Sequence, residues 1–210
     1  MCNICGSSSL EKAHTLYLDG LVRGSFASGF LAYTKNHFIV LKQQTPFEYS
    51  YLLETVKAQI DEFPIYYLFH SRAPTNSAET EFDYNTTHPF NFGYYFVSHN
   101  GIIQNFKSFP SHSEFDVDSS IIPFHLHNNL GDISKTYSSY QGLLTSWIYD
   151  TETLYVVKAG SSLHIHKDSF SSMAFEKSES VDTDGVVYEF TGLNFKLHST
   201  FNYKNPYFLL

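Results

Sequence analysis

The sequence is poor in several residue types that mark common classes of protein. Its 210 residues include two cysteines, one tryptophan and seven prolines, and 13 Lys and Arg stand against 21 Asp and Glu. A disulfide-rich secreted scaffold needs several cysteine pairs, so two cysteines argue against that class. The formal net charge of -8 argues against direct nucleic-acid binding and against an anionic membrane surface as partner, because both attract basic patches.

Long apolar segments are missing as well. No stretch reaches the roughly 20 apolar residues that a transmembrane helix needs, and the N-terminus lacks the basic and then apolar pattern of a signal peptide. Position 2 is Cys, whereas N-myristoylation requires Gly there. These absences predict a cytoplasmic protein with no membrane partner.

Aromatic residues are abundant instead. The chain contains 20 Phe and 16 Tyr, and hydrophobic residues make up 42% of it, which suffices for a packed core. Aromatic side chains favour the half-buried surface of a sheet. The length suits one domain.

Apolar patterning predicts many short strands and a few helices. One helix is expected after the N-cap Ser9, a second between Pro46 and Pro64, and a third segment, SSIIPFHLHNNLG, is expected to be interrupted at Pro123. The strand at 93–101 is expected to end in a turn at its Asn-Gly pair. The other expected strands are residues 2–6, 29–34, 37–43, 65–72, 142–150, 153–160, 162–168, 185–190 and 195–201. This order predicts an α+β fold of two stacked sheets with helices outside.

The two cysteines, Cys2 and Cys5, stand directly behind the initiator methionine. A structural zinc site needs four ligands, and the His-x-His pairs at 125–127 and 164–166 lie far along the chain without finger spacing. A redox pair should follow a strand and open a helix inside the chain. The remaining interpretation is that removal of the methionine exposes Cys2 as a nucleophile. We therefore expect neither a metal nor a cofactor.

A cysteine at a mature N-terminus carries its own base, the α-amino group. The ordinary pKa of that amine is roughly 8, so it can accept the thiol proton directly or through a water. A side-chain amide and a backbone N–H can hold an oxyanion, and Asn100 and Gly101 offer both. Arg72 matches a carboxylate bidentately, and Asp118 matches an ammonium group. Together with Cys2, these residues predict chemistry on an α-amino acid.

The order of the motifs resembles that of the class II glutamine amidotransferase domain, an N-terminal-nucleophile hydrolase. The opening Met-Cys-Asn-Ile-Cys-Gly is similar to the family's Met-Cys-Gly-Ile with a glycine two residues later. Arg23 begins an Arg-Gly-x-x-x-x-Gly stretch, and Arg72 begins a partly matching glutamine loop, Arg-Ala-Pro-Thr. The family's His-Pro pair is present at His88, and residues 99–105 reproduce His-Asn-Gly-Ile-Ile-x-Asn intact. Asp118 falls where the family has Thr-Asp before an apolar run.

This resemblance implies a fold and a reaction. The fold would be a four-layer αββα sandwich, with two mainly antiparallel sheets between helices. Cys2 would be the nucleophile, and Asn100 and Gly101 would form the oxyanion hole. Attack on the side-chain amide of glutamine would release ammonia, and hydrolysis of a glutamyl thioester would complete the reaction.

The same resemblance implies a set of substrate-binding residues. Arg72 would hold the glutamine carboxylate with help from Thr75, and Asp118 would take the α-amino group. Arg23 would support the nucleophile end of the site, and His88 belongs to the same set. The loop after Arg72 lacks the aromatic residue and the glycine that are usual in the family, which motivates a γ-glutamyl compound as an alternative substrate.

We expect residues 1–210 to form a single domain with no separate acceptor or synthetase domain. The expected function is that of a stand-alone glutaminase subunit that passes ammonia to a separate synthetase. Two alternatives stay open at this point: a γ-glutamyl amidohydrolase that needs no partner, and a non-catalytic binding module on the same scaffold.

Overall fold

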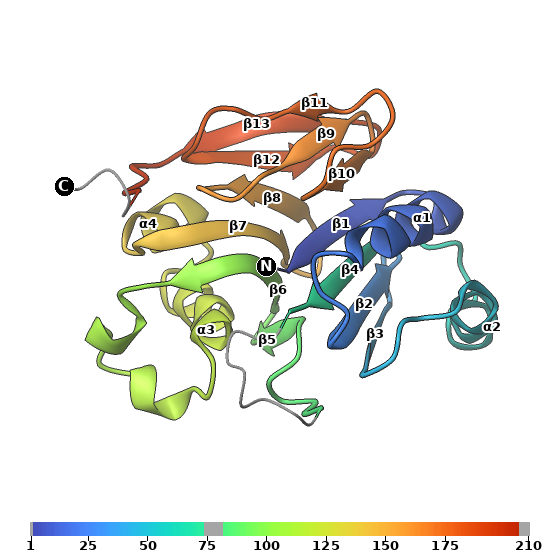
Figure 1. Cartoon of the computed structure of the whole chain (residues 1–210), viewed down its shortest axis with the longest axis horizontal. Coiled ribbons are helices and arrows are strands. Elements are labelled where there is room, and N and C mark those ends of the chain that lie inside the picture. Colours follow the sequence, from blue (N-terminus) through green and yellow to red (C-terminus); the bar gives the residue numbers. More distant parts are fainter. Residues whose placement is uncertain (1, 74–81, 206–210) are drawn as a thin grey trace.

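The chain forms two β-sheets that pack face to face (Figure 1). The computed structural model describes residues 2–73 and 82–205. In spatial order, the seven-stranded sheet contains β11 (Glu179–Ser180), β9 (His164–His166), β10 (Ser169–Ser171), β1 (Asn3–Ser7), β4 (Tyr66–Arg72), β2 (Ala27–Tyr33) and β3 (Phe38–Gln43). The six-stranded sheet contains β13 (Phe195–Thr200), β12 (Val186–Phe190), β8 (Leu154–Lys158), β7 (Gly142–Tyr149), β6 (Tyr95–Ile103) and β5 (Phe90–Phe92). Neighbouring strands are antiparallel throughout.

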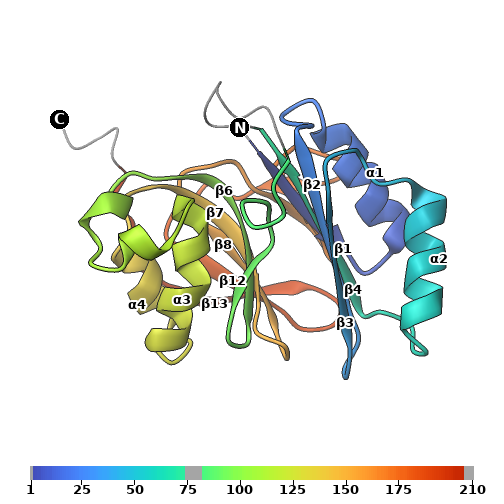
Figure 2. The same ribbon diagram turned by 90° about the horizontal axis from the view of Figure 1, so that it is seen from below.

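Helices cover both outer faces of the sheets (Figure 2). On the seven-stranded sheet lie α1 (Leu10–Gly20) and α2 (Tyr49–Gln59), and on the six-stranded sheet lie α3 (Ile121–Asn128) and α4 (Ile133–Ser138). Short 3₁₀ turns at Phe106–Ser108, His112–Glu114 and Asp118–Ser120 connect β6 to α3. The layers are thus helix, sheet, sheet and helix, which confirms the predicted αββα architecture.

The space between the sheets is filled mainly by large apolar and aromatic side chains. Leu68 of β4 and Trp147 of β7 are fully buried there, and the Trp147 indole donates a hydrogen bond of 3.2 Å to the carbonyl of Phe69. Tyr33 and Tyr149 stack across the same space with ring centroids 4.1 Å apart. Burial of these rings stabilises the sandwich, and the indole hydrogen bond fixes one sheet against the other.

The helices differ from the sequence predictions in their ends. Ser9 caps α1 as predicted, because its hydroxyl accepts a hydrogen bond from the Lys12 N–H. α2 ends at Gln59 rather than at Pro64, since Ile60 already has extended backbone angles. Pro123 does not interrupt α3, so that prediction was wrong: it lies in the first turn, where an N–H has no intrahelical acceptor to lose.

Strand β6 corrects a second prediction. The Asn100-Gly101 pair was expected to form a turn, but β6 continues to Ile103. Pairing with β7 places Asn100 opposite Thr145 and Gly101 opposite Leu144. The ladder with β7 outweighs the local turn preference of the Asn-Gly sequence, so both residues belong to a strand of the six-stranded sheet.

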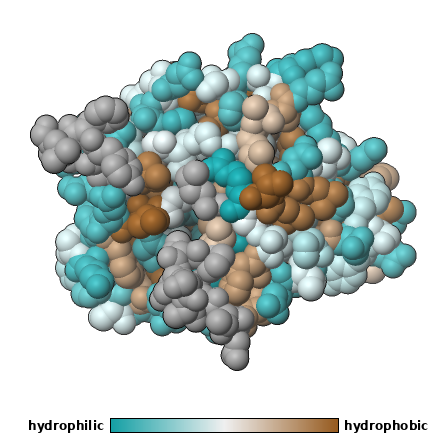
Figure 3. Space-filling view, viewed as in Figure 1, coloured by the Kyte–Doolittle hydropathy of each residue, from teal (hydrophilic) through white to brown (hydrophobic). Residues whose placement is uncertain are grey.

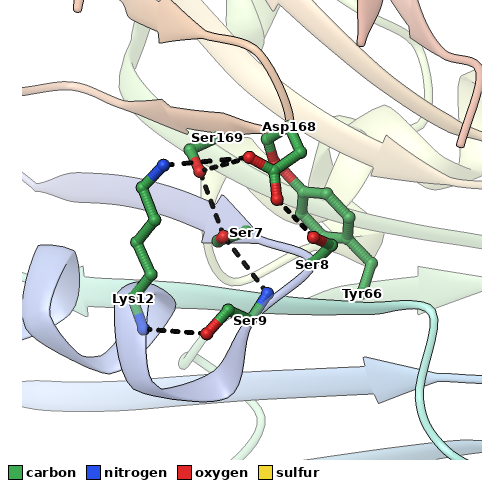
Figure 4. A network of polar contacts seen from close by, with 7 residues as sticks. All are labelled: Ser7, Ser8, Ser9, Lys12, Tyr66, Asp168 and Ser169. Carbon is green, nitrogen blue, oxygen red and sulfur yellow. Dashed lines mark hydrogen bonds and ion pairs between the residues drawn. The ribbon is translucent and has the colours of Figure 1, made fainter. Parts of the chain in front are cut away.

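A polar network joins the end of β1 and the start of α1 to the turn between β9 and β10 (Figure 4). Asp168 accepts a hydrogen bond from the Ser8 hydroxyl and lies 3.8 Å from the Lys12 ammonium, while its carbonyl accepts from Tyr66 at 2.7 Å. Burial alone would raise the pKa of Asp168, but the hydrogen bonds from Ser8 and Ser169 and the charge of Lys12 outweigh it. The pKa therefore lies below its ordinary value.

Replacing Asp168 with alanine should lower the free energy of unfolding by about 1 kcal/mol, because the network is partly exposed to solvent. Urea denaturation at pH 7 measures this change. Since the folded-state pKa is lowered, the contribution is present above the ordinary pKa of about 4 and is lost as the pH falls through the folded value. Alanine at Lys177, whose ion pair with Glu176 is exposed, is the control and should change stability little. Equal effects of the two substitutions would contradict this role.

One face of the molecule carries both polar and apolar side chains at its surface (Figure 3). On the face shown in Figure 3, apolar side chains gather in separate areas among polar ones. Within the part of the chain that the structure describes, no helix combines the length and apolarity needed to cross a membrane.

Candidate active site

Residues from distant parts of the sequence meet at a small cavity at one end of the sandwich. Cys2, Arg72, His88, Gly101 and Asp118 all line it, and its volume is about 30 Å³. The topology explains why they meet. β1 lies beside β4 in the seven-stranded sheet, and the pairing of Asn3 with Ser71 places Cys2 next to Arg72. The other three residues come from the second sheet and its connections, so the cavity lies where the two sheets meet.

Cys2 lies immediately before β1 with its side chain in this cavity. Its thiol donates a long hydrogen bond of 3.9 Å to the carbonyl of Ala73. Burial raises the pKa of the Cys2 thiol, and the positive charge of Arg72 opposes this only in part. The thiol is therefore protonated at neutral pH, and it needs a base before it can act as a nucleophile.

Arg72, the last residue of β4, is 5% exposed. Its guanidinium donates a hydrogen bond of 3.4 Å to the Thr86 hydroxyl and lies 5.7 Å from the centre of the Phe26 ring. The backbone is fixed too, because the Arg72 carbonyl accepts a hydrogen bond of 2.9 Å from the Phe26 N–H. A buried cation held in this way at the cavity wall is suited to binding an anion.

Asp118 is held by the backbone and lies beside a chain of bonded side chains. One carboxylate oxygen accepts a hydrogen bond of 2.6 Å from the Ile103 N–H, and the other lies 3.3 Å from the Ser119 hydroxyl. The Ser119 hydroxyl also bonds Nδ1 of His99 at 2.9 Å, and Nε2 of His99 bonds the Leu143 carbonyl at 2.7 Å. Burial lowers the pKa of His99, with Asp118 acting in the opposite direction. A neutral His99 thus donates from Nε2 and accepts the Ser119 proton at Nδ1. The hydroxyl then has no proton left for Asp118, and the Ile103 N–H is the donor that fixes the carboxylate.

Gly101 occupies a position where no other residue fits. Its φ angle is +153°, and a Cβ atom there would lie 1.8 Å from the Leu143 carbonyl oxygen. Glycine is therefore required by close approach of β7 as well as by backbone conformation. The absence of a side chain also leaves the backbone of β6 open to the cavity.

Asn100 and Arg23 lie beside the cavity but do not line it. The Asn100 side chain is buried and donates a hydrogen bond of 3.1 Å to the hydroxyl of Ser172. Arg23 donates to the Ser172 carbonyl at 2.8 Å and to the Ser162 hydroxyl at 3.0 Å, and its guanidinium would attract the Cys2 thiolate once that forms. Thr75, the remaining predicted residue, lies outside the described residues.

The Cys-x-x-Cys sequence does not form one site. Cys5 is fully buried and its thiol lies 4.0 Å from the carbonyl of Ala13, so it faces α1 on the outer side of the sheet. Cys2 lies at the cavity instead. Across the described ranges, 2–73 and 82–205, no group of three or more His, Cys, Asp or Glu side chains could hold a metal ion.

Several solved structures share the layered arrangement of this chain. No protein-family model and no curated protein matches the chain significantly. The glutamine phosphoribosylpyrophosphate amidotransferase of B. subtilis superposes with a TM-score of 0.69 at 14% identity, over 94% of this chain and 49% of that one. A glutamine aminotransferase class-II domain protein from Silicibacter pomeroyi gives 0.56 at 12% identity, over 96% of this chain and 100% of that one. This chain has the fold of a class II glutamine amidotransferase domain.

This chain matches only part of the length of two of these solved structures. A second solved structure, described as the allosteric regulatory enzyme of purine biosynthesis, gives a TM-score of 0.67 at 16% identity over 94% of this chain. This chain spans about half the length of that protein and of the B. subtilis enzyme, at 49% each.

Besides Thr86, which bonds Arg72, two serines of this amidotransferase-fold site escaped the sequence analysis. Ser172 follows β10 and forms two hydrogen bonds with Ile4, one to each backbone group, at 2.9 and 3.2 Å. It thereby fixes β1 next to Cys2. Ser119 links Asp118 to His99. Serine is too common in loops for either position to stand out, and only the folded arrangement shows their role.

Proposed function

We propose that this chain hydrolyses the side-chain amide of glutamine through Cys2 and supplies the ammonia to a separate acceptor enzyme. The observation that carries this proposal is the convergence of Cys2, Arg72, Gly101 and Asp118 on one cavity. A thiol, a cation, an anion and an open backbone segment are the groups that an amide-hydrolysing site for an amino acid requires.

The two charges define the substrate class. Arg72 is suited to the α-carboxylate of an amino acid, and Asp118 to its α-amino group. Both side chains are already held by hydrogen bonds to the protein. The entropy that these side chains would lose when the substrate binds is therefore small. The amide of a glutamine bound by these two groups would extend toward Cys2.

The nucleophile requires a base because burial raises the pKa of its thiol. Removal of Met1 would free the α-amino group of Cys2, which would accept the thiol proton. The sulfur would attack the amide carbon, and the oxyanion would be held by the Gly101 N–H and the Asn100 amide, which has a second N–H besides the one bonded to Ser172. The α-ammonium would return the proton to the leaving nitrogen, releasing ammonia. Water would then hydrolyse the glutamyl thioester to glutamate and free thiol.

The direct test measures intact mass and glutamate release on one purified sample. We expect a mass that lacks Met1 and release of glutamate from glutamine, because both follow from an N-terminal cysteine nucleophile. A panel of γ-glutamyl amides in the same assay tests the alternative substrate class. If Met1 is removed and a γ-glutamyl amide is hydrolysed while glutamine is not, the substrate is a γ-glutamyl compound and not glutamine. No turnover of either, alone or with a candidate synthetase, would contradict an enzymatic role.

A further inference from the structure

Two histidine rings stack behind the cavity, and the proposed reaction uses neither of them. The rings of His70, in β4, and His88 have centroids 3.9 Å apart and planes 33° apart. Both residues are buried. Within the described ranges neither ring nitrogen of His88 has a hydrogen-bond partner, and the His70 ring has only a weak contact with the backbone of His99. Buried polar atoms of this kind are rare in proteins and call for an explanation.

The pair bridges the two sheets at the end that holds the cavity. β5 pairs with β6 as far as Phe90 opposite Val97, so His88 lies just beyond the paired part of β5, in line with His99. His70 belongs to the other sheet and reaches β6, where the backbone of His99 raises its pKa against the larger effect of burial. The two rings therefore meet where one sheet faces the other.

The backbone of His88 is fixed independently of its ring. Its carbonyl packs so closely against Gly29 of β2 that a Cβ atom there would lie 2.1 Å from the oxygen. The ring packs edge-on against Phe90, with centroids 4.6 Å apart, on one side and against His70 on another. Since His88 also lines the cavity with Arg72, the neighbouring rings set the direction in which its nitrogens point.

The surroundings keep both rings neutral. Burial is the main cause of a lowered pKa at His88 and at His70, where the pKa is about 3. The other groups that face His88 are His70 and Arg72 of β4, His99 of β6 and Lys42 of β3, and each acts in the same direction. A neutral imidazole has one N–H to donate. Asp118 lines the same cavity, but it accepts from the Ile103 N–H, and within the described ranges no carboxylate is bonded to the His88 ring.

We propose that His70 is a positioning residue, whose ring stacks on His88 and directs a ring N–H of His88 toward the carboxylate that Arg72 binds. The inference rests on the proposed function, in which that carboxylate belongs to glutamine. His88 then shares the anion with Arg72, and His70 acts only through His88.

Kinetics of His70 variants separate this role from a merely structural one. In His70→Ala the stack is lost, and we expect the KM for glutamine to rise about tenfold while kcat stays within about threefold. His70→Phe keeps a stacked ring and should return KM to within about threefold of wild type. The control is His14→Ala, a buried histidine bonded to the Phe47 carbonyl on the outer side of the same sheet, which should leave KM unchanged. An unchanged KM in His70→Ala, or a fall in kcat alone, would overturn the proposal.

Nitrogen NMR of the histidine rings gives a readout that needs neither turnover nor a stable His70→Ala protein. In wild type, the His88 ring should stay neutral in one tautomer from pH 8 to about pH 5.5, and its N–H resonance should shift when L-glutamate is added. In His70→Ala the His88 ring should become a mixture of both tautomers. In His70→Phe, which can be measured even if the alanine variant does not fold, it should stay in a single tautomer. Mixed tautomers in wild type, or no shift with bound glutamate, would overturn the proposal.

The two proposals can fail separately. If wild type releases no glutamate but its single His88 tautomer becomes mixed in His70→Ala, the glutaminase function fails and the positioning role stands for another carboxylate. If wild type turns over glutamine but neither the KM nor the His88 tautomer changes when His70 is replaced, the positioning role fails and the glutaminase function stands.

Discussion

Replacing Cys2 with alanine should reduce glutamate release from glutamine by a factor of about 10⁴ or more. The substitution removes the nucleophile, and no thioester can form without it. The cavity is small and the side chain lies next to Arg72 and Gly101, so loss of the sulfur should leave the fold intact. A coupled glutamate assay with a circular dichroism spectrum of each sample measures both effects.

The other cysteine provides the matched control. Cys5→Ala removes a thiol three residues away that faces α1 rather than the cavity. It should lower the free energy of unfolding by about 1 kcal/mol, through lost packing, and leave activity within a factor of about two. An electrophilic glutamine analogue should label wild type and the Cys5 variant once and should not label the Cys2 variant. Turnover by the Cys2 variant above about 1% of wild type would show that another group is the nucleophile.

Replacing Gly101 with alanine should have the second largest effect, on both stability and activity. A Cβ atom would meet the Leu143 carbonyl oxygen at 1.8 Å, in a backbone conformation that favours glycine. β6 and β7 would have to separate locally, at a cost of about 3 kcal/mol. The shift would also displace the proposed oxyanion donor, so we expect kcat of the folded protein to fall by a factor of about 10² to 10³. Thermal denaturation and glutaminase assays measure the two changes.

Gly192 is the control for backbone conformation alone. Its φ angle is +90°, yet nothing lies within 4 Å of the place where a Cβ atom would be. Gly192→Ala should therefore lower the free energy of unfolding by about 1 to 2 kcal/mol, through left-handed backbone strain alone. It should leave kcat unchanged. Similar losses in the two variants would mean that φ, and not the approach of β7, explains the glycine at position 101.

The sequence was sufficient to predict the layers and to name residues that meet at one cavity, for identifiable reasons. Apolar runs predicted strands such as residues 65–72, and β4 is found there. Cys2, Arg72 and Asp118 could be named because their chemistry is rare in such a combination, and the structure brings them together.

What the sequence could not predict depends on contacts between distant segments. The Asn-Gly pair at position 100 looks like a turn until β7 pairs with it, and Pro123 is harmless only because the helix happens to begin two residues earlier. The hydrogen bond from the Asn100 amide to Ser172, which leaves its second N–H for the proposed oxyanion, also has no signal in the sequence. His70 carries no local signal at all, since a histidine within an apolar strand is defined only by what packs against it.

One hydroxyl group connects the strand that carries the nucleophile to the strand that carries Asn100. The oxygen of Ser172 accepts from the Ile4 N–H at 3.2 Å and from the Asn100 amide at 3.1 Å, and these donors belong to different sheets. The spacing between these two segments of the candidate site is thus held by a direct link, in addition to the side chains that pack between the sheets. A change in the side chains between the sheets would therefore act on this spacing only against two hydrogen bonds that converge on one oxygen.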